Sequence, residues 1–127
     1  MQDRFKFRSY GRPNSIIEGM QNIYTFEESK DGYFNVKVDK GWLSFVKEED
    51  LKIMQCTGLK DKNGKLIYEG DIVKDLIIPE IFYIVKWFNS GFYLESTISG
   101  SFLKFNDTQQ EVIGNIYENP ELLKDGE

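Results

Sequence analysis

The residue types that most often carry catalysis are nearly absent from this chain. Its 127 residues include no histidine and a single cysteine, Cys56. Histidine is the commonest general base and the usual partner of a serine or cysteine nucleophile, so the composition argues against hydrolase triads. One cysteine without histidine can neither close an internal disulfide nor complete a zinc site. We therefore predict no metal and no cofactor, and we expect Cys56 to be a buried, unreactive thiol.

Carboxylates are the remaining candidates for chemistry, in the run Glu48-Glu49-Asp50 and in Glu69-Gly70-Asp71. Such groups can do acid–base work or hold a hard cation. For the run, a solvated turn is the favoured interpretation. In the second segment, a carboxylate beside a glycine can accept backbone N–H groups and fix a tight turn, and we favour this role over ligand contact. The chain is predicted not to be an enzyme, and an enzyme acting through Glu69 and Asp71 alone is the least favoured hypothesis.

A basic and aromatic segment opens the chain. Because side chains alternate across a strand, Arg4, Lys6 and Arg8 would share one cationic face, with Arg12 just beyond it. This face could form ion pairs with the acidic C-terminal domain, within the chain or across subunits, which is the favoured interpretation. It could instead contact RNA or single-stranded DNA by combining charge with stacking.

Two further features complete the candidate interaction surface. The lysines Lys60, Lys62 and Lys65 surround an Asn63-Gly64 turn and are expected to project together from the surface. Trp42 follows a glycine, and it is either a core residue, the favoured interpretation, or an exposed contact residue.

The distribution of charge disfavours nucleic acid as a partner. The net charge is −5; residues 1–54 hold nine basic and nine acidic side chains, whereas residues 55–127 hold seven and twelve. Nucleic-acid binding draws most of its sequence-independent affinity from lysine and arginine, and an acidic domain repels phosphates.

Short alternating runs broken by Gly, Asn, Asp and Pro predict a mostly β fold. Residues 1–53 are expected to form an N-terminal β segment and residues 54–127 a second domain. In the first, Asp31-Gly32 is a favoured hairpin turn pair, and residues 47–50 could form one helical turn. The strands expected in this segment lie at Phe5–Ser9, Asn22–Phe26, Tyr33–Val38 and Trp42–Val46.

The second domain should be built around one strong strand, Ile81–Phe88, paired with Phe92–Ser96. Asn63-Gly64 predicts a type I′ hairpin turn, and Asn119-Pro120 predicts a short terminal helix or turn. The remaining strands are expected at Gln55–Leu59, Lys65–Tyr68, Ile72–Val73, Phe102–Phe105 and Glu111–Tyr117.

Aromatic residues make up 15% of the chain, and about half of them are phenylalanine. Phenylalanine has no polar group, so we expect a phenylalanine-rich core, with Trp87 also inside it. The first residues do not form a secretory signal, and the apolar runs are far shorter than the roughly 20 residues of a membrane helix. We therefore expect a soluble, cytoplasmic chain without membrane contact.

Three segments carry a resemblance to a known family. They are MQCTGLKDKNGK at Met54–Lys65, IYEGDIV at Ile67–Val73 and VIGNIYENPEL at Val112–Leu122. Through them the chain resembles the YopX family of phage and prophage proteins. The segment Lys6–Tyr10 is similar to the family's opening strand, although Gly11 stands where an acidic residue is expected.

The resemblance implies a C-terminal domain similar to a small SH3-like barrel or roll, preceded by a variable N-terminal β segment, in a phage or in a bacterial host cell carrying phage genes. It implies no established activity and no catalytic residue. The leading hypothesis is a non-enzymatic protein-binding or assembly module with a host or phage partner, or one that forms a homo-oligomer. The alternative is a nucleic-acid accessory protein that uses the basic N-terminal strand.

Overall fold

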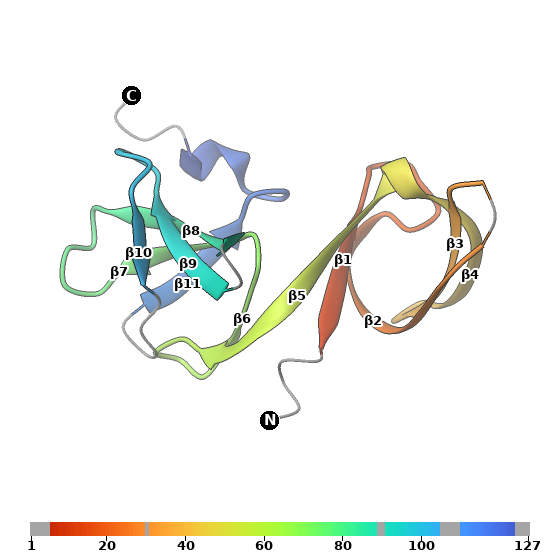
Figure 1. Ribbon diagram of the computed structural model, residues 1–127, viewed down its shortest axis with the longest axis horizontal. Coiled ribbons are helices and arrows are strands. Elements are labelled where there is room, and N and C mark those ends of the chain that lie inside the picture. Colours follow the sequence, from red (N-terminus) through yellow and green to blue (C-terminus); the bar gives the residue numbers. More distant parts are fainter. Residues whose placement is uncertain (1–5, 30, 89–90, 105–109, 124–127) are drawn as a thin grey trace. The chain divides into compact units, whose positions relative to one another are not determined.

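The computed structural model describes residues 6–29, 31–88, 91–104 and 110–123 (Figure 1). As predicted, the chain is mostly β, and within these residues it contains antiparallel strands and two short 3₁₀ turns but no α-helix. The chain divides into two compact units, Gln2–Gln55 and Cys56–Glu127. The strand β5 (Leu51–Lys60) passes from one unit into the next, and the expected boundary after residue 53 lies inside it.

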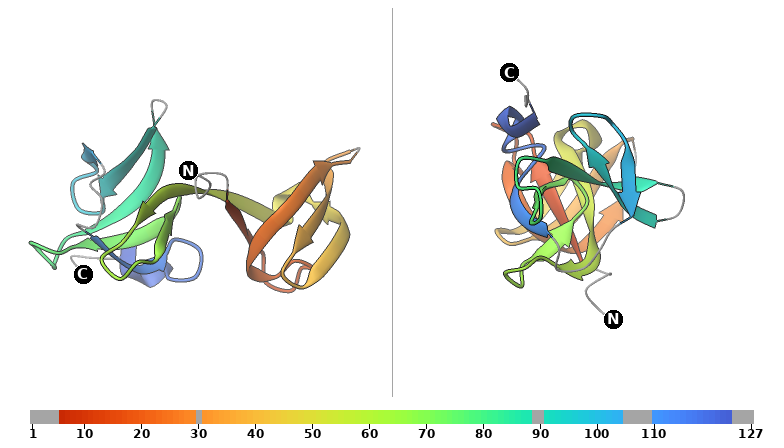
Figure 2. Two further views of the ribbon diagram at one scale, coloured as in Figure 1. Left: turned by 90° about the horizontal axis from the view of Figure 1, so that it is seen from below. Right: turned by 90° about the vertical axis from the view of Figure 1, so that its left-hand side faces the viewer.

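The N-terminal unit is a sheet with the strand order β4-β3-β2-β1-β5, and every neighbouring pair is antiparallel (Figure 2). The strands expected at 22–26, 33–38 and 42–46 are confirmed. Asp31 and Gly32 both have positive φ, 63° and 77°, as their turn requires. The expected helical turn is the 3₁₀ turn η2 (Glu48–Asp50). The other elements are β1 (Phe7–Gly11), β2 (Gly19–Glu28), β3 (Tyr33–Val38) and β4 (Gly41–Lys47).

The C-terminal unit contains an open sheet with the order β10-β9-β8-β7-β11, which is compatible with an SH3-like roll but is not a closed barrel. β8 lies at its centre, as the strong β pattern predicts. A short strand, β6, pairs with the end of β5. The elements are β6 (Leu66–Tyr68), β7 (Asp71–Asp75), β8 (Phe82–Phe88), β9 (Gly91–Ser96), β10 (Phe102–Lys104), β11 (Gln110–Asn115) and the 3₁₀ turn η3 (Pro120–Leu123).

The hairpin between β5 and β6 differs from the expected type I′ turn. Only Gly64, with a φ of 82°, adopts the left-handed region, whereas Asn63 does not. The Gly64 N–H donates to the Asp61 carbonyl, and the Asp61 N–H donates to the Lys65 carbonyl. The loop is therefore a longer turn that ends on a left-handed glycine, another common hairpin form.

The Asp61 side chain is the reason for the longer loop. It is 2% exposed, and its carboxylate accepts the N–H groups of Asn63 and Lys65 within the loop and of Val112 on β11, each at 2.9 Å. Burial opposes the charged carboxylate, but these three donors outweigh it and lower the pKa of Asp61. Asp61 thus joins the hairpin to a strand 51 residues away.

Asp71 has the structural role that the sequence favoured. Its buried carboxylate accepts the Tyr68 N–H at 2.8 Å across Gly70, whose φ is 89°. Cys56 is fully buried, as expected.

Each unit has its own small aliphatic core. Around Val36 in the N-terminal unit and Val85 in the C-terminal unit, the fully buried residues are mainly valine and isoleucine. The expectation of a phenylalanine-rich core is wrong, because none of the described phenylalanines is fully buried. β-branched side chains suit these small cores, since they pack closely on a pleated sheet.

Candidate interaction surface

Phenylalanine gathers at the surface of both units. Phe34 and Phe92 pack partly against the two cores, and Phe82 is half-buried. The other described phenylalanines are exposed: Phe7, Phe26, Phe45, Phe88 and Phe102. Single exposed apolar residues need no explanation, but a group on one face marks an interaction site. The positions of the exposed aromatic rings on the strands therefore indicate which face is the candidate interaction surface.

The outer face of β2, β3 and β4 carries the most exposed aromatic group. Val36 and Val38 point into the core, so the alternate residues of β3 point outwards, and Lys37 lies opposite Trp42. The outer aromatic face consists of Tyr24, Tyr33, Trp42 and Phe45. Tyr24, Trp42 and Phe45 are 61%, 60% and 70% exposed.

A β-bulge brings Phe45 onto this face. Phe34 pairs with Val46 but Val36 pairs with Leu43, so two residues of β4 oppose the single Asn35. Phe45 has a φ of 59°, which is rare for a bulky residue. Its N–H donates to Asn35 Oδ1 at 3.3 Å, and its ring meets that of Tyr33 edge-on at 6.3 Å. Strained aromatic residues of this kind are a pointer to function.

Two shallow hollows flank Tyr33. The larger, of about 730 Å³, extends towards Phe45 and Asn35, and the acidic residues of its lining are Glu27, Glu28 and Asp31.

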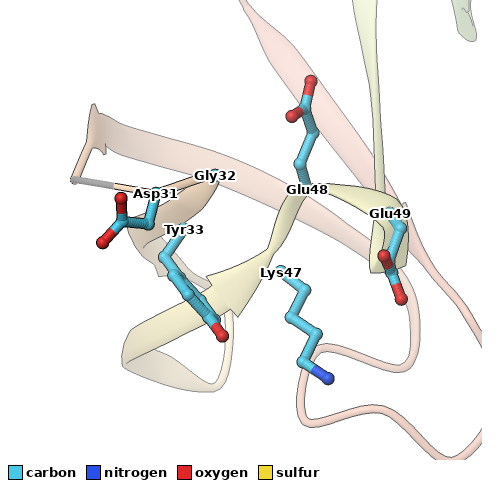
Figure 3. Close-up of a pocket in the computed structure, with 6 residues that line it drawn as sticks. All are labelled: Asp31, Gly32, Tyr33, Lys47, Glu48 and Glu49. Carbon is cyan, nitrogen blue, oxygen red and sulfur yellow. The ribbon is translucent and has the colours of Figure 1, made fainter.

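The smaller hollow, of about 430 Å³, is shown in Figure 3. There the side chains of Tyr33 and Lys47 leave neighbouring strands on the same side, while Glu48 points the opposite way. Asp31 and Glu49 complete its charged lining. Lys47 is the only basic residue among the described lining of either hollow.

Tyr24 is fixed at the other end of the face. Its hydroxyl donates to Asp39 Oδ1 at 2.8 Å, and Asp39 also accepts the Asn22 N–H at 2.8 Å. The Asn22 and Tyr24 donors lower the pKa of Asp39, and the hydrogen bond to Asp39 raises that of Tyr24. The Lys37 ammonium lies over the Tyr24 ring, 5.8 Å from its centroid.

The model of the YopX protein family matches residues 6–124. The chain belongs to the YopX family. The resemblance found in its motifs is thereby confirmed, and the match covers both units.

Two solved structures are similar over nearly their whole length. Protein yopX from Bacillus subtilis is 18% identical, with a TM-score of 0.62, over 98% of this chain and 99% of that one. Protein EF1440 from Enterococcus faecalis is 26% identical, with a TM-score of 0.52, over 94% and 97%. No curated protein sequence matches the chain. These similarities define the fold of this YopX-family member but no activity.

The basic strand that the sequence singled out is largely occupied in the fold. Arg4 lies outside the described residues, and Lys6 is exposed. Arg8 is only 9% exposed, so the strand face that was expected to be wholly cationic is largely covered at that position. β1 lies between β2 and β5 in the sheet. Arg12 forms an ion pair with Asp50 at 2.6 Å, within the same unit.

The other candidate residues are at the surface. Lys60, Lys62 and Lys65 are exposed in the C-terminal unit, and Lys62 approaches Glu111 at 3.6 Å. Trp42 is exposed, so its favoured assignment to the core is wrong and the alternative is correct.

Trp87 is a further correction, because it is 49% exposed near the end of β8, where its ring meets that of Phe92 edge-on at 4.9 Å. A second aromatic group lies on the other face of this strand in the C-terminal unit, since Phe88 directly follows Trp87. There Phe88 stacks on Phe102, with centroids 4.6 Å apart, and meets Tyr93 edge-on.

Phe45 and Asn35 were missed by sequence reasoning. Strict alternation places Leu43 and Phe45 on one face of β4 and Val46 on the other. One signal could have revealed the bulge, because Leu43 and Val46 are three residues apart and can face one core only if an extra residue is inserted.

Among the described residues, no cluster of acidic, cysteine or histidine side chains could hold a metal ion, and no helix is long and apolar enough to cross a membrane.

Proposed function

We propose that this YopX-family chain is a non-enzymatic protein-binding module whose contact surface is the outer aromatic face. The observation that carries the proposal is the exposure of Tyr24, Trp42 and Phe45 on one side of one sheet. Tyrosine and tryptophan are enriched in the energetically dominant centres of protein interfaces. Holding them on paired strands supports binding, because little conformational entropy is then lost.

The form of β4 favours contact through this face over addition of a partner strand. β4 is at the end of its sheet, where an extra strand could pair. The bulge and the left-handed Phe45 interrupt the regular backbone that such pairing requires. Side chains on the face are therefore the better means of contact.

The alternative functions have less support. Burial of Arg8 and the Arg12–Asp50 ion pair leave less of the basic strand available for nucleic acid. The Asp71 carboxylate, which a carboxylate-only enzyme would need, is buried in a turn. A phage or prophage source, a cytoplasmic location and homo-oligomerisation stay predictions.

The proposal is tested by affinity retention on the immobilised full chain. We expect Trp42→Ala to lose the proteins that the unaltered chain retains. Ile77→Ser is the control, because Ile77 is an apolar residue in the other unit that is also mostly exposed, and it should lose nothing. Light scattering should show whether a second copy is the partner. Equal retention by both variants, or a strict monomer that retains no protein, contradicts the proposal.

A further inference from the structure

Building on the proposed function, we infer that the outer aromatic face accepts a cationic side chain, an arginine or lysine of its protein partner. The site is the larger hollow, where Tyr33 and Phe45 lie beside Glu27, Glu28 and Asp31. A partner segment rich in basic residues is the occupant that this chemistry fits.

The described lining of the hollow is acidic. It includes Glu27, Glu28 and Asp31 and no basic residue. Like charges gathered in a concave surface raise the local concentration of opposite charge and speed its association. The same field repels phosphate groups, so a basic protein segment is favoured over nucleic acid.

The aromatic walls add a second attraction for the same ligand. A cation within about 6 Å of a ring centroid is drawn to the negative face of the ring. The Lys37 ammonium already makes this contact with Tyr24 on the same face, at 5.8 Å. Phe45 is 70% exposed, so most of its ring surface is open to a partner.

The surrounding contacts hold the hollow in shape. Asn35 contacts both an aromatic and an acidic residue of the hollow. Its Oδ1 accepts the Phe45 N–H at 3.3 Å, and its Nδ2 lies 3.5 Å from Glu27 Oε1. The ring and the carboxylate are thereby positioned together before a ligand arrives. Such preorganisation reduces the ordering that binding requires.

Other occupants fit less well. The described acidic residues form no cluster that could hold a metal ion. A second copy facing the hollow with its own acidic hollow would be repelled. Arginine suits the site better than either, because its planar group both stacks on rings and pairs with carboxylates.

The experiment measures binding of a labelled eight-residue peptide of alternating Arg and Ser to the full chain by fluorescence anisotropy. We expect saturable binding that weakens with salt, and no binding of the matching Glu–Ser peptide. Phe45→Gly and the double variant Glu27→Gln/Glu28→Gln should each weaken binding by about tenfold. Glycine suits the left-handed backbone at position 45, so the first variant is expected to stay folded.

The matched control is Glu80→Gln/Glu121→Gln, which removes the same charge from exposed positions in the C-terminal unit. It should change the affinity less than about twofold. Equal weakening by both double variants would reduce the effect to general attraction by an acidic chain and overturn the inference, as would the absence of peptide binding. If Trp42→Ala still loses a protein partner in that case, the proposed function stands and only its cationic specificity fails.

Discussion

Position 45 should reverse the usual order of stability between alanine and glycine. In an ordinary strand, a glycine variant is less stable than the alanine variant by about 0.5–1 kcal/mol, because glycine loses more conformational entropy on folding. A left-handed backbone costs other residues about 1–2 kcal/mol, and glycine avoids that cost. At a φ of 59° we therefore expect Phe45→Gly to be more stable than Phe45→Ala by about 0.5–1 kcal/mol.

The native Phe45 side chain contributes only modestly to stability. Full burial of this side chain is worth about 1.5–3 kcal/mol, but Phe45 is 70% exposed, so its packing contributes well under 1 kcal/mol. Its edge contact with Tyr33 adds about 0.5 kcal/mol. Phe45→Ala should therefore destabilise the chain by about 1 kcal/mol. For Phe45→Gly, relief of strain offsets most of this loss, which leaves the chain within about 0.5 kcal/mol of its original stability.

The assay is urea unfolding of the three forms, with the stability taken from the midpoint at an unchanged slope. Lys52 is the control, because it is exposed on β5 and has an ordinary strand backbone. There the alanine variant should be the more stable by about 0.5–1 kcal/mol. An alanine variant that is also more stable than glycine at position 45 would refute the left-handed bulge.

Three other changes give distinct results. Gly11→Ala should destabilise the chain by about 3 kcal/mol or more, or prevent folding, because a Cβ at this position overlaps the Ile17 carbonyl. A variant that unfolds at the same urea midpoint as the unaltered chain would contradict this. Trp42→Ala should lower the free energy of unfolding, measured in urea, by less than about 1 kcal/mol, since the ring is mostly exposed. A larger loss would show that Trp42 packs in the core. Asp61→Asn should destabilise by about 1–3 kcal/mol, because its amide cannot accept from all three donors. The pKa of Asp61 in the folded chain lies below its unfolded value of about 3.9, so the stability that its carboxylate contributes is present above a pH of about 3.9 and is lost as the pH falls. The asparagine variant should therefore lose less stability on acidification than the unaltered chain. An unchanged acid dependence would contradict the role assigned to Asp61.

The regular parts of the fold followed from local patterns. Tyr33–Val38 and Ile81–Phe88 were predicted because alternation and β-branched or aromatic content report a half-buried strand without knowledge of its neighbours. Asp31-Gly32 was predictable because few residue pairs tolerate two positive φ angles.

The features that define the candidate surface depend on distant residues. The burial of Arg8 was not predictable, because alternation shows which residues share a strand face but not how far the rest of the fold covers that face. The role of Asp61 was not predictable from local sequence, because its third donor, Val112, is far along the chain. Phenylalanine content was assigned to the core because composition cannot distinguish a ring that packs inside from one held outward for a partner.

The central claim, that the outer aromatic face binds a protein, is tested most directly by photo-crosslinking. Thr25 is exposed on this face, beside Lys37, and it can carry p-benzoylphenylalanine while all four aromatic residues remain. In cells that make the chain, irradiation should give a discrete protein adduct from position 25 and none from the same group at Ile77. No adduct from position 25, or adducts only from position 77, would contradict the account.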